Sequence, residues 1–303
     1  MTHRPWWTGL GTIALASLLP GAGMIMAFFM PGILVAQCAA VDRERLGPLW
    51  PSLFLLVLAL GLFLEGALFV GTELLLFSWG LYWAREKGLE IPQILIWLTT
   101  LFAIFYCLFF LYGYIVSGID LEAILKEIRE AIQKGLSPYD LDQDQQKRIV
   151  DSLVEFIPFL IALSVICITY CNILVTNFIG RRMGKNEATI FGPRFESFRL
   201  PENLIWLGIL GGAGTLFLHG PIKIAATNLL FTVLALYCIQ GAGMLKYFMT
   251  RYGVNRIIQW VVFLLISTSW YGLVGVTIMG VSDVWTDVRR TRFEGTDSSH
   301  GNV

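Results

Sequence analysis

Residues 181–206, RRMGKNEATIFGPRFESFRLPENLIW, join two long apolar segments of a chain of 303 residues. The basic residues of this stretch are Arg181, Arg182, Lys185, Arg194 and Arg199. Short loops rich in Lys and Arg stay on the cytoplasmic side of a membrane, so this loop orients the whole chain. Pro201 and Glu202 suit the first turn of a helix, where a missing N–H costs nothing and negative charge meets the positive end of the dipole. We therefore expect a membrane helix to begin at Pro201, with Trp206 at the membrane–water interface.

The composition is typical of an integral membrane protein. Hydrophobic residues make up 56% of the chain and charged residues 15%, with a mean hydropathy of +0.67; soluble domains carry about 25% charged residues. The formal net charge is zero, which argues against a nucleic-acid partner. We predict an all-α, polytopic transmembrane helical bundle of about eight or nine spans in the bacterial inner membrane. It is expected to be a single domain over residues 1–293, followed by a disordered tail at 294–303.

The first apolar stretch, residues 9–41, is too long for one upright span, since a span needs about 20 residues. It is interrupted at Pro20-Gly21 and again at Met30-Pro31-Gly32. Two short helices that meet near Pro20 or one long kinked helix both fit this pattern. Backbone groups freed at such interruptions need partners inside the protein.

The second apolar stretch, residues 49–84, is also too long for one span. Glu65-Gly66 lies near its middle, so we expect a hairpin of two helices, 49–64 and 67–84. Further spans are expected at 93–117, 156–180, 201–218, 222–245 and 257–281.

Residues 119–155 differ from the rest. Their apolar residues follow the i, i+3, i+4 spacing of an amphipathic helix: Leu121, Ile124, Leu125, Ile128 and Ile132. A second polar helix is expected from near Asp142. Alternation of sides places this segment outside the cytoplasm, on the membrane surface, either as a lid or as a solvated connector.

The basic segments around the last span conflict. Lys246, Arg251 and Arg256 precede the span at 257–281, while Arg289, Arg290 and Arg292 follow it. One crossing between two basic segments breaks the positive-inside trend. The internal loops carry more weight, which places the C-terminus outside unless the last segment is re-entrant.

The sequence contains no motif that would supply chemistry. It has no HExxH, GxSxG or Walker loop, and we predict neither catalytic residues nor a metal nor a cofactor. Whether the chain is an enzyme stays open, with a non-enzymatic role favoured. Cys167 and Cys171 lie one helical turn apart, but small apolar packing residues explain them better than metal ligands.

Glu65 and Glu73 are the carboxylates well inside apolar segments. A central charge costs about 2.5–3.5 kcal/mol on insertion scales, so such groups face protein or water. They form either a ligand or ion site, or a solvated hairpin tip at Glu65 with a hydrogen-bonded Glu73 below it. Asn172 is a further candidate ligand-binding residue, although a hydrogen bond between helices explains it as well. Gln240 is expected to face the interface near a span end.

Two segments carry a resemblance to a known family. They are PFLIALSVICITYCNILVTNFIGRRMG, which holds Pro158 and Asn172, and FESFRLPENLIW, which holds Phe195 and Trp206. With the closing DVWTDVR from Asp283, they resemble the YybS-like family of uncharacterised bacterial membrane proteins. That resemblance covers nearly the whole chain and implies a class without a mechanism. The N-terminal half is also similar in style to the substrate-binding membrane subunits of energy-coupling-factor transporters, at the level of fold only.

Two hypotheses for function follow. The first is a transporter-like membrane subunit that binds an unidentified small molecule and has no ATPase of its own, so that it needs an energising partner protein or an ion gradient. The second is a membrane scaffold that recruits protein partners through the basic loop 181–199 and the helices at 119–155.

Overall fold

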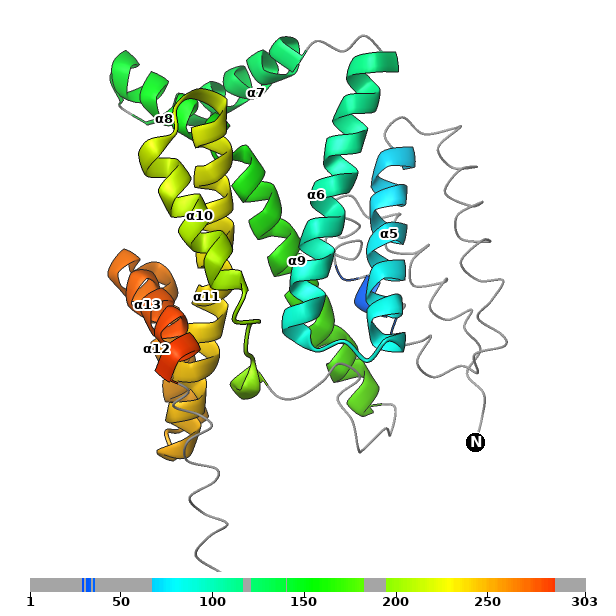
Figure 1. Ribbon diagram of the computed structural model, residues 1–303, viewed down its shortest axis with the longest axis vertical. Coiled ribbons are helices and arrows are strands. Elements are labelled where there is room, and N and C mark those ends of the chain that lie inside the picture. The colour runs from blue at the N-terminus through cyan, green and yellow to red at the C-terminus, as the bar shows by residue number, and fades with distance from the viewer. Residues whose placement is uncertain are drawn as a thin grey trace, which may run out of the picture. The chain divides into compact units, whose positions relative to one another are not determined.

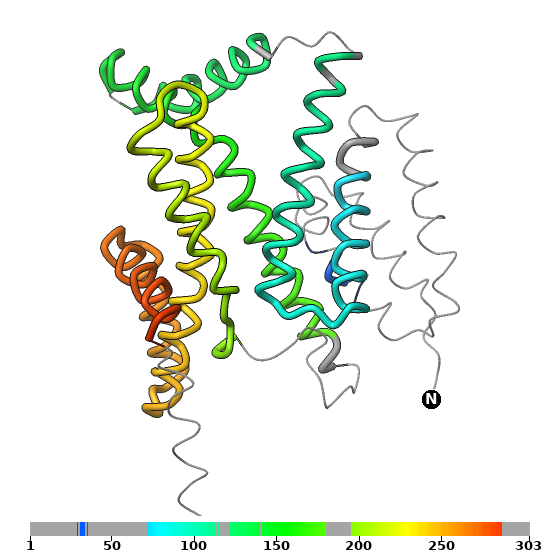
Figure 2. Tube along the Cα trace, viewed as in Figure 1, coloured from blue at the N-terminus to red at the C-terminus, as the bar shows by residue number. Residues whose placement is uncertain are grey.

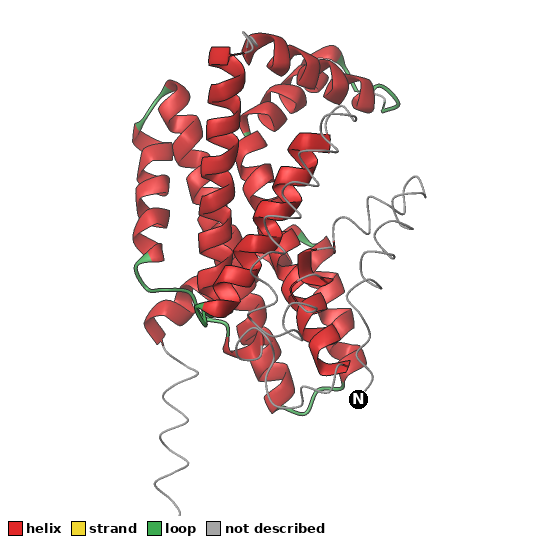
Figure 3. Ribbon diagram, turned by 90° about the vertical axis from the view of Figure 1, so that its right-hand side faces the viewer, coloured by secondary structure: helices red, strands yellow, loops and turns green. Residues whose placement is uncertain are grey.

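The computed structural model describes residues 29, 31–33, 35, 67–116, 121–139, 141–182 and 195–286. Across these residues the chain is helical with short connections and has no strand, as Figure 3 shows. The chain divides into two compact units, Met1–Phe105 with Ser164–Pro193, and Tyr106–Leu163 with Arg194–Val303. The expected single domain over residues 1–293 stays a prediction. The tail at 294–303 lies outside the described residues.

The first unit contains α5 (Ala67–Glu86) and most of α6 (Ile91–Val116) and α9 (Ile157–Arg182), both of which continue into the second unit. Stacked Trp83 and Trp97, with ring centroids 4.7 Å apart, join α5 to α6. Phe77 and Phe102 add a second aromatic contact at 5.1 Å. The helix expected at 67–84 and the spans expected at 93–117 and 156–180 therefore form close to their predicted bounds. The helix expected at 49–64 lies outside the described residues.

The second unit begins with α7 (Leu121–Leu136) and α8 (Gln143–Glu155). Asp142 caps α8 by accepting a hydrogen bond from the Gln145 N–H at 2.7 Å, and Arg129 of α7 lies 3.7 Å from Asp151 of α8. The two helices expected between residues 119 and 155 are confirmed. Their position outside the membrane stays a prediction.

The remaining elements of the second unit follow the basic loop, and their traces are clear in Figure 2. They are η1 (Phe195–Ser197), α10 (Leu204–Phe217), α11 (Gly220–Arg251), α12 (Arg256–Thr268) and α13 (Trp270–Thr286). Figure 1 shows α10 beside α11 and α13 beside the lower half of α11, with α12 against α13. The residues 195–203 are called the strap below.

Three described helices are long and apolar enough to cross a membrane: Ile91–Tyr112, Ile157–Ile179 and Gly220–Arg251. The pair α12–α13 passes the same test only as a bent unit, with 106° between its two helices. The helix α10 is apolar but shorter. The expected eight or nine spans remain a prediction, since most of residues 1–66 lie outside the described part.

Three expectations are corrected. The helix after the basic loop begins at Leu204, not at Pro201, because the Leu200 N–H is bound by the Gln240 side chain and residues 202–203 form a turn before the helix. The last apolar segment is not one helix, since it is interrupted at Ser269. An interruption is not seen at Pro31 and Gly32, which are both helical, while Met30 lies outside the described residues; the Gly32 N–H is bound by the Asn172 side chain.

Candidate functional site

Asn172 of α9 bonds the backbone at Pro31-Gly32. Its Oδ1 accepts the Gly32 N–H at 2.7 Å, and its side chain is 0% exposed. Thr176, one turn further along α9, donates its hydroxyl to the Gly32 carbonyl at 2.9 Å. Proline disturbs the hydrogen bonding of a helix, and here two buried side chains bond the backbone of the residue that follows it. Asn172 therefore joins two segments far apart in sequence; a role in ligand binding stays a prediction.

The two carboxylates predicted for a ligand or ion site have different outcomes. Glu73 lies in α5 and is half-buried, so its side chain faces protein at least on one side. Glu65 lies outside the described residues. The distance between Glu65 and Glu73 is therefore not defined, and a site shared by the two carboxylates stays a prediction.

The described residues of the predicted orientation loop lie at the end of α9, before the loop, and in the strap, after it. Arg181 and Arg182 form the last turn of α9, while Arg194 lies outside the described residues. Arg199 is half-buried in the strap and Pro201 is exposed. Trp206 is 64% exposed on α10, which agrees with a position at the membrane surface or in lipid.

The Gln240 side chain is a buried polar group of the second unit that makes three hydrogen bonds. It is 0% exposed. Its Oε1 accepts the Leu200 N–H at 2.9 Å, and its Nε2 donates to Asp283 Oδ2 at 2.9 Å and to the Gly280 carbonyl at 3.2 Å. One amide on α11 thus holds the strap on one side and α13 on the other. The expectation that Gln240 faces the interface was wrong.

Asp283 is 1% exposed, and the sequence analysis did not select it as a site residue. A buried carboxylate needs hydrogen-bond donors, since leaving it unpaired costs several kcal/mol. Gln240 supplies one such donor. The sequence signal for this pair was weak, because an amide and a carboxylate 43 residues apart share no spacing rule.

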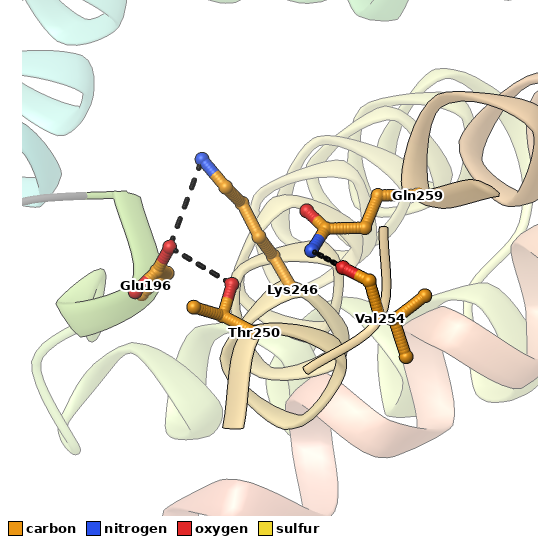
Figure 4. Close-up of polar contacts among 5 residues, drawn as sticks. All are labelled: Glu196, Lys246, Thr250, Val254 and Gln259. Carbon is orange, nitrogen blue, oxygen red and sulfur yellow. Dashed lines mark hydrogen bonds and ion pairs between the residues drawn. The ribbon is translucent and has the colours of Figure 1, made fainter. Parts of the chain in front are cut away.

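The strap is fixed along α11 by a second set of contacts, shown in Figure 4. Glu196 Oε1 accepts the Thr250 hydroxyl at 3.2 Å and lies 4.0 Å from Lys246 Nζ. On the other side of the α11–α12 turn, Gln259 Nε2 donates to the Val254 carbonyl at 2.9 Å. The strap therefore follows α11 from Gln240 to Thr250, toward the end of the helix at Arg251.

A glycine contact brings α11 and α13 together beside Gln240. A Cβ on Gly241 would meet the Val276 carbonyl oxygen, and a Cβ on Gly280 would meet the Tyr237 carbonyl oxygen. Small residues let helix backbones approach this closely. The contact brings the Gly280 carbonyl and Asp283 within reach of the Gln240 amide.

At the other end of α11, Asn228 holds the joint between α8 and α9. Its Oδ1 accepts the Phe159 N–H at 2.8 Å, and its Nδ2 donates to the Glu155 carbonyl at 2.8 Å. Phe231 packs against Phe156 and Phe159, with centroids 5.1 and 5.6 Å away. The end of α8 is therefore fixed near the Gly220 end of α11.

Within the residues that the structure describes, no group of three or more His, Cys, Asp or Glu side chains is placed to hold a metal ion. We assign no cofactor to the site. What the arrangement provides, among the described residues, is a set of buried amides and hydroxyls and one buried carboxylate, Asp283, within apolar helices.

Comparison with known proteins gives a family and no relative of known activity. A family profile described as "Predicted membrane protein (DUF2232)" matches residues 12–284. No curated protein and no solved structure matches the chain. The resemblance to uncharacterised multi-pass membrane proteins is thus confirmed over most of the chain, and the chain belongs to the predicted membrane protein family DUF2232.

Proposed function

We propose that the protein is a transporter-like membrane subunit that binds a small molecule and has no ATPase of its own. The observation that carries this proposal is Glu73, a half-buried carboxylate in the apolar part of α5, away from the charged Arg85 and Glu86 in the last turn of that helix. An ionisable group inside a membrane segment is costly and marks a ligand or ion site by default. We assign Glu73, with Glu65 and Asn172, to that site.

Further features support the proposal. Interrupted apolar helices with buried polar groups beside them are common at the binding sites of transporters. The pair α12–α13 is interrupted in this way at Ser269, and the buried Asp283 follows in α13. We place the protein in the bacterial inner membrane, with eight or nine membrane segments and a partner protein or ion gradient as the source of energy.

The test is purification of the tagged full-length protein in mild detergent, with mass spectrometry of bound small molecules. We expect the wild type to retain a metabolite that Glu73→Gln loses by at least tenfold. Glu90→Gln is the matched control, since Glu90 is exposed in the connection before α6 and the same substitution there should leave the bound molecule unchanged. Equal retention by Glu73→Gln and wild type would reject the site.

A membrane scaffold is the second candidate function. It is favoured by the α7–α8 pair, whose charged residues Lys126, Arg129 and Glu130 are exposed, and by the basic loop 181–199. Under this hypothesis the same purification yields a stable protein partner and no metabolite. Substitution of Arg181 and Arg182 by Gln should then release the partner, while Glu73→Gln should not.

A further inference from the structure

We propose that α12 and α13 form a re-entrant hairpin, which enters the membrane from the side of Arg251 and returns to that side. The chain would then leave α13 on the same side of the membrane as the strap. This inference concerns topology and holds whether the protein is a transporter subunit or a scaffold.

The lengths of the two helices argue against a simple crossing. With 13 and 17 residues, they measure roughly 20 and 26 Å at ~1.5 Å per residue. Each is shorter than the ~30 Å hydrocarbon core of a membrane. The 106° bend between them means that α13 does not continue in the direction of α12. In Figure 1 the pair rises from the lower end of α11 and α13 turns back toward that end.

The start of the hairpin is fixed at the Arg251 end of α11. Asn255 caps α12 by accepting the Ile257 N–H at 3.0 Å, and Gln259 reaches back to the Val254 carbonyl. Gly253 has a φ of 67°, which turns the chain tightly between α11 and α12. The connection between α11 and α12 is therefore a short turn, and α12 begins next to the end of α11.

The end of the hairpin is fixed by Gln240. The same side chain bonds Leu200 of the strap and Asp283 near the end of α13. The strap leaves the basic loop beside Thr250, where Glu196 is bound, and runs along α11 to Gln240, where Leu200 is bound, before α10 begins. Asp283 therefore lies at the depth at which the chain enters α10 from the basic loop. A crossing α13 would end instead near His219, at the far end of α11.

At the tip of the hairpin, nearby hydroxyl side chains form hydrogen bonds with the backbone groups. Ser267 donates to the Leu264 carbonyl at 2.8 Å, and Thr268 donates to the Leu264 and Leu265 carbonyls at 3.1 Å each. Ser269 Oγ accepts the Gly272 N–H at 3.3 Å. In a membrane the groups freed by an interruption must be bonded internally, whereas a turn in water would not need three hydroxyls in a row. The tip is apolar around them, with Leu264, Leu265 and Tyr271 exposed.

The proposal removes the charge conflict of the sequence. Arg251 and Arg256 before the hairpin and the basic residues after it, Arg289, Arg290 and Arg292, then lie on one side. That is the arrangement favoured by the positive-inside rule.

The test is labelling of cysteines, introduced one at a time into the full-length chain, with a membrane-impermeant maleimide in right-side-out and inside-out vesicles. Tyr252→Cys reports the α11–α12 turn, His219→Cys the opposite end of α11, Tyr271→Cys the tip and Ser298→Cys the segment after α13. Unsubstituted protein, whose cysteines lie in apolar segments, gives the background. We expect Ser298→Cys to be labelled with Tyr252→Cys in inside-out vesicles, at least tenfold above right-side-out vesicles. His219→Cys should show the reverse.

Labelling of Ser298→Cys together with His219→Cys would overturn the proposal in favour of a bent crossing. Labelling of Tyr271→Cys from the His219 side would also overturn it, because the hairpin would then cross fully twice. If Ser298→Cys reacts in neither preparation, a C-terminal reporter enzyme that is active on one side only decides between the two topologies. Each variant is checked for wild-type expression and elution in detergent, so that a misfolded variant is not scored.

Discussion

At the scale of single residues, Gln240 carries the largest predicted effect. Replacement by Leu keeps the volume but removes the donor to Asp283 and the acceptor for the Leu200 N–H. Each buried group left unpaired costs about 1–3 kcal/mol, so we expect Gln240→Leu to lower stability by roughly 2–5 kcal/mol. The measurement is thermal unfolding of the purified protein in detergent. Gln133→Leu, on the exposed face of α7, is the control and should unfold within a degree or two of wild type. An unchanged midpoint for Gln240→Leu would show that the hydrogen bonds are not structural.

Gln240 was misplaced from the sequence for a physical reason. Hydropathy averages over a whole segment, so a single amide near a span end is ranked with interfacial residues. What buries it is the approach of α13 and the strap, both of which are distant in sequence. The hydrogen bond of Asn172 was easier to predict from the sequence, since an amide in the middle of an apolar span has few partners other than another helix. Its bond to Gly32 is of that kind.

At the scale of elements, substitution by alanine should change the stability of the protein differently at two glycines of α13. A Cβ on Gly280 meets the Tyr237 carbonyl oxygen, whereas one on Gly275 meets nothing within 4 Å. We expect Gly280→Ala to destabilise by about 1–3 kcal/mol or more through overpacking. Gly275→Ala should be neutral or stabilise by up to ~1 kcal/mol, because alanine favours the helix. Unfolding midpoints in detergent test both variants. Equal shifts would contradict the close contact between α11 and α13.

The interruption of the last apolar segment shows where sequence patterns fail at this scale. Neither Pro nor Gly stands at Ser269, so the usual signal for a helix end is missing. The signal that was present is the run Ser267-Thr268-Ser269, whose hydroxyls bond nearby backbone groups and compete with the helix. By contrast α7 and α8 were predictable, because their apolar spacing and the Asp142 cap depend on local sequence alone.

At the scale of the whole molecule, the class was predictable and the arrangement was not. Composition and apolar runs indicated a helical membrane protein, as the family match over residues 12–284 supports. The helices α6 and α9 fall near their predicted bounds because length and hydropathy determine them. The pairing of α11 with α13 depends on glycine contacts and one amide, which no local pattern reports. The loop at Arg181–Arg199 predicted an orientation for the chain, which stays a prediction, but its sequence did not reveal that the residues at its end bind along α11.

The side of the membrane on which α7 and α8 lie gives the last prediction. Asn228 fixes the end of α8 near the Gly220 end of α11, and roughly 35 Å of helix, at ~1.5 Å per residue, separates Asn228 from Arg251. That length exceeds the ~30 Å hydrocarbon core, so α7 and α8 should face the side opposite the strap. We expect trypsin to cut after Lys134, beside the exposed turn between the two helices, in right-side-out vesicles only.

The fragment that ends at Lys134 is identified by the Lys134→Gln variant, which should not produce it. The same cut in inside-out vesicles alone would reverse the orientation deduced from the basic loop, whereas cutting in both preparations would show that the vesicles leak. Since Arg251 is exposed at the other end of α11, its cleavage in inside-out vesicles provides the internal check that both faces are accessible.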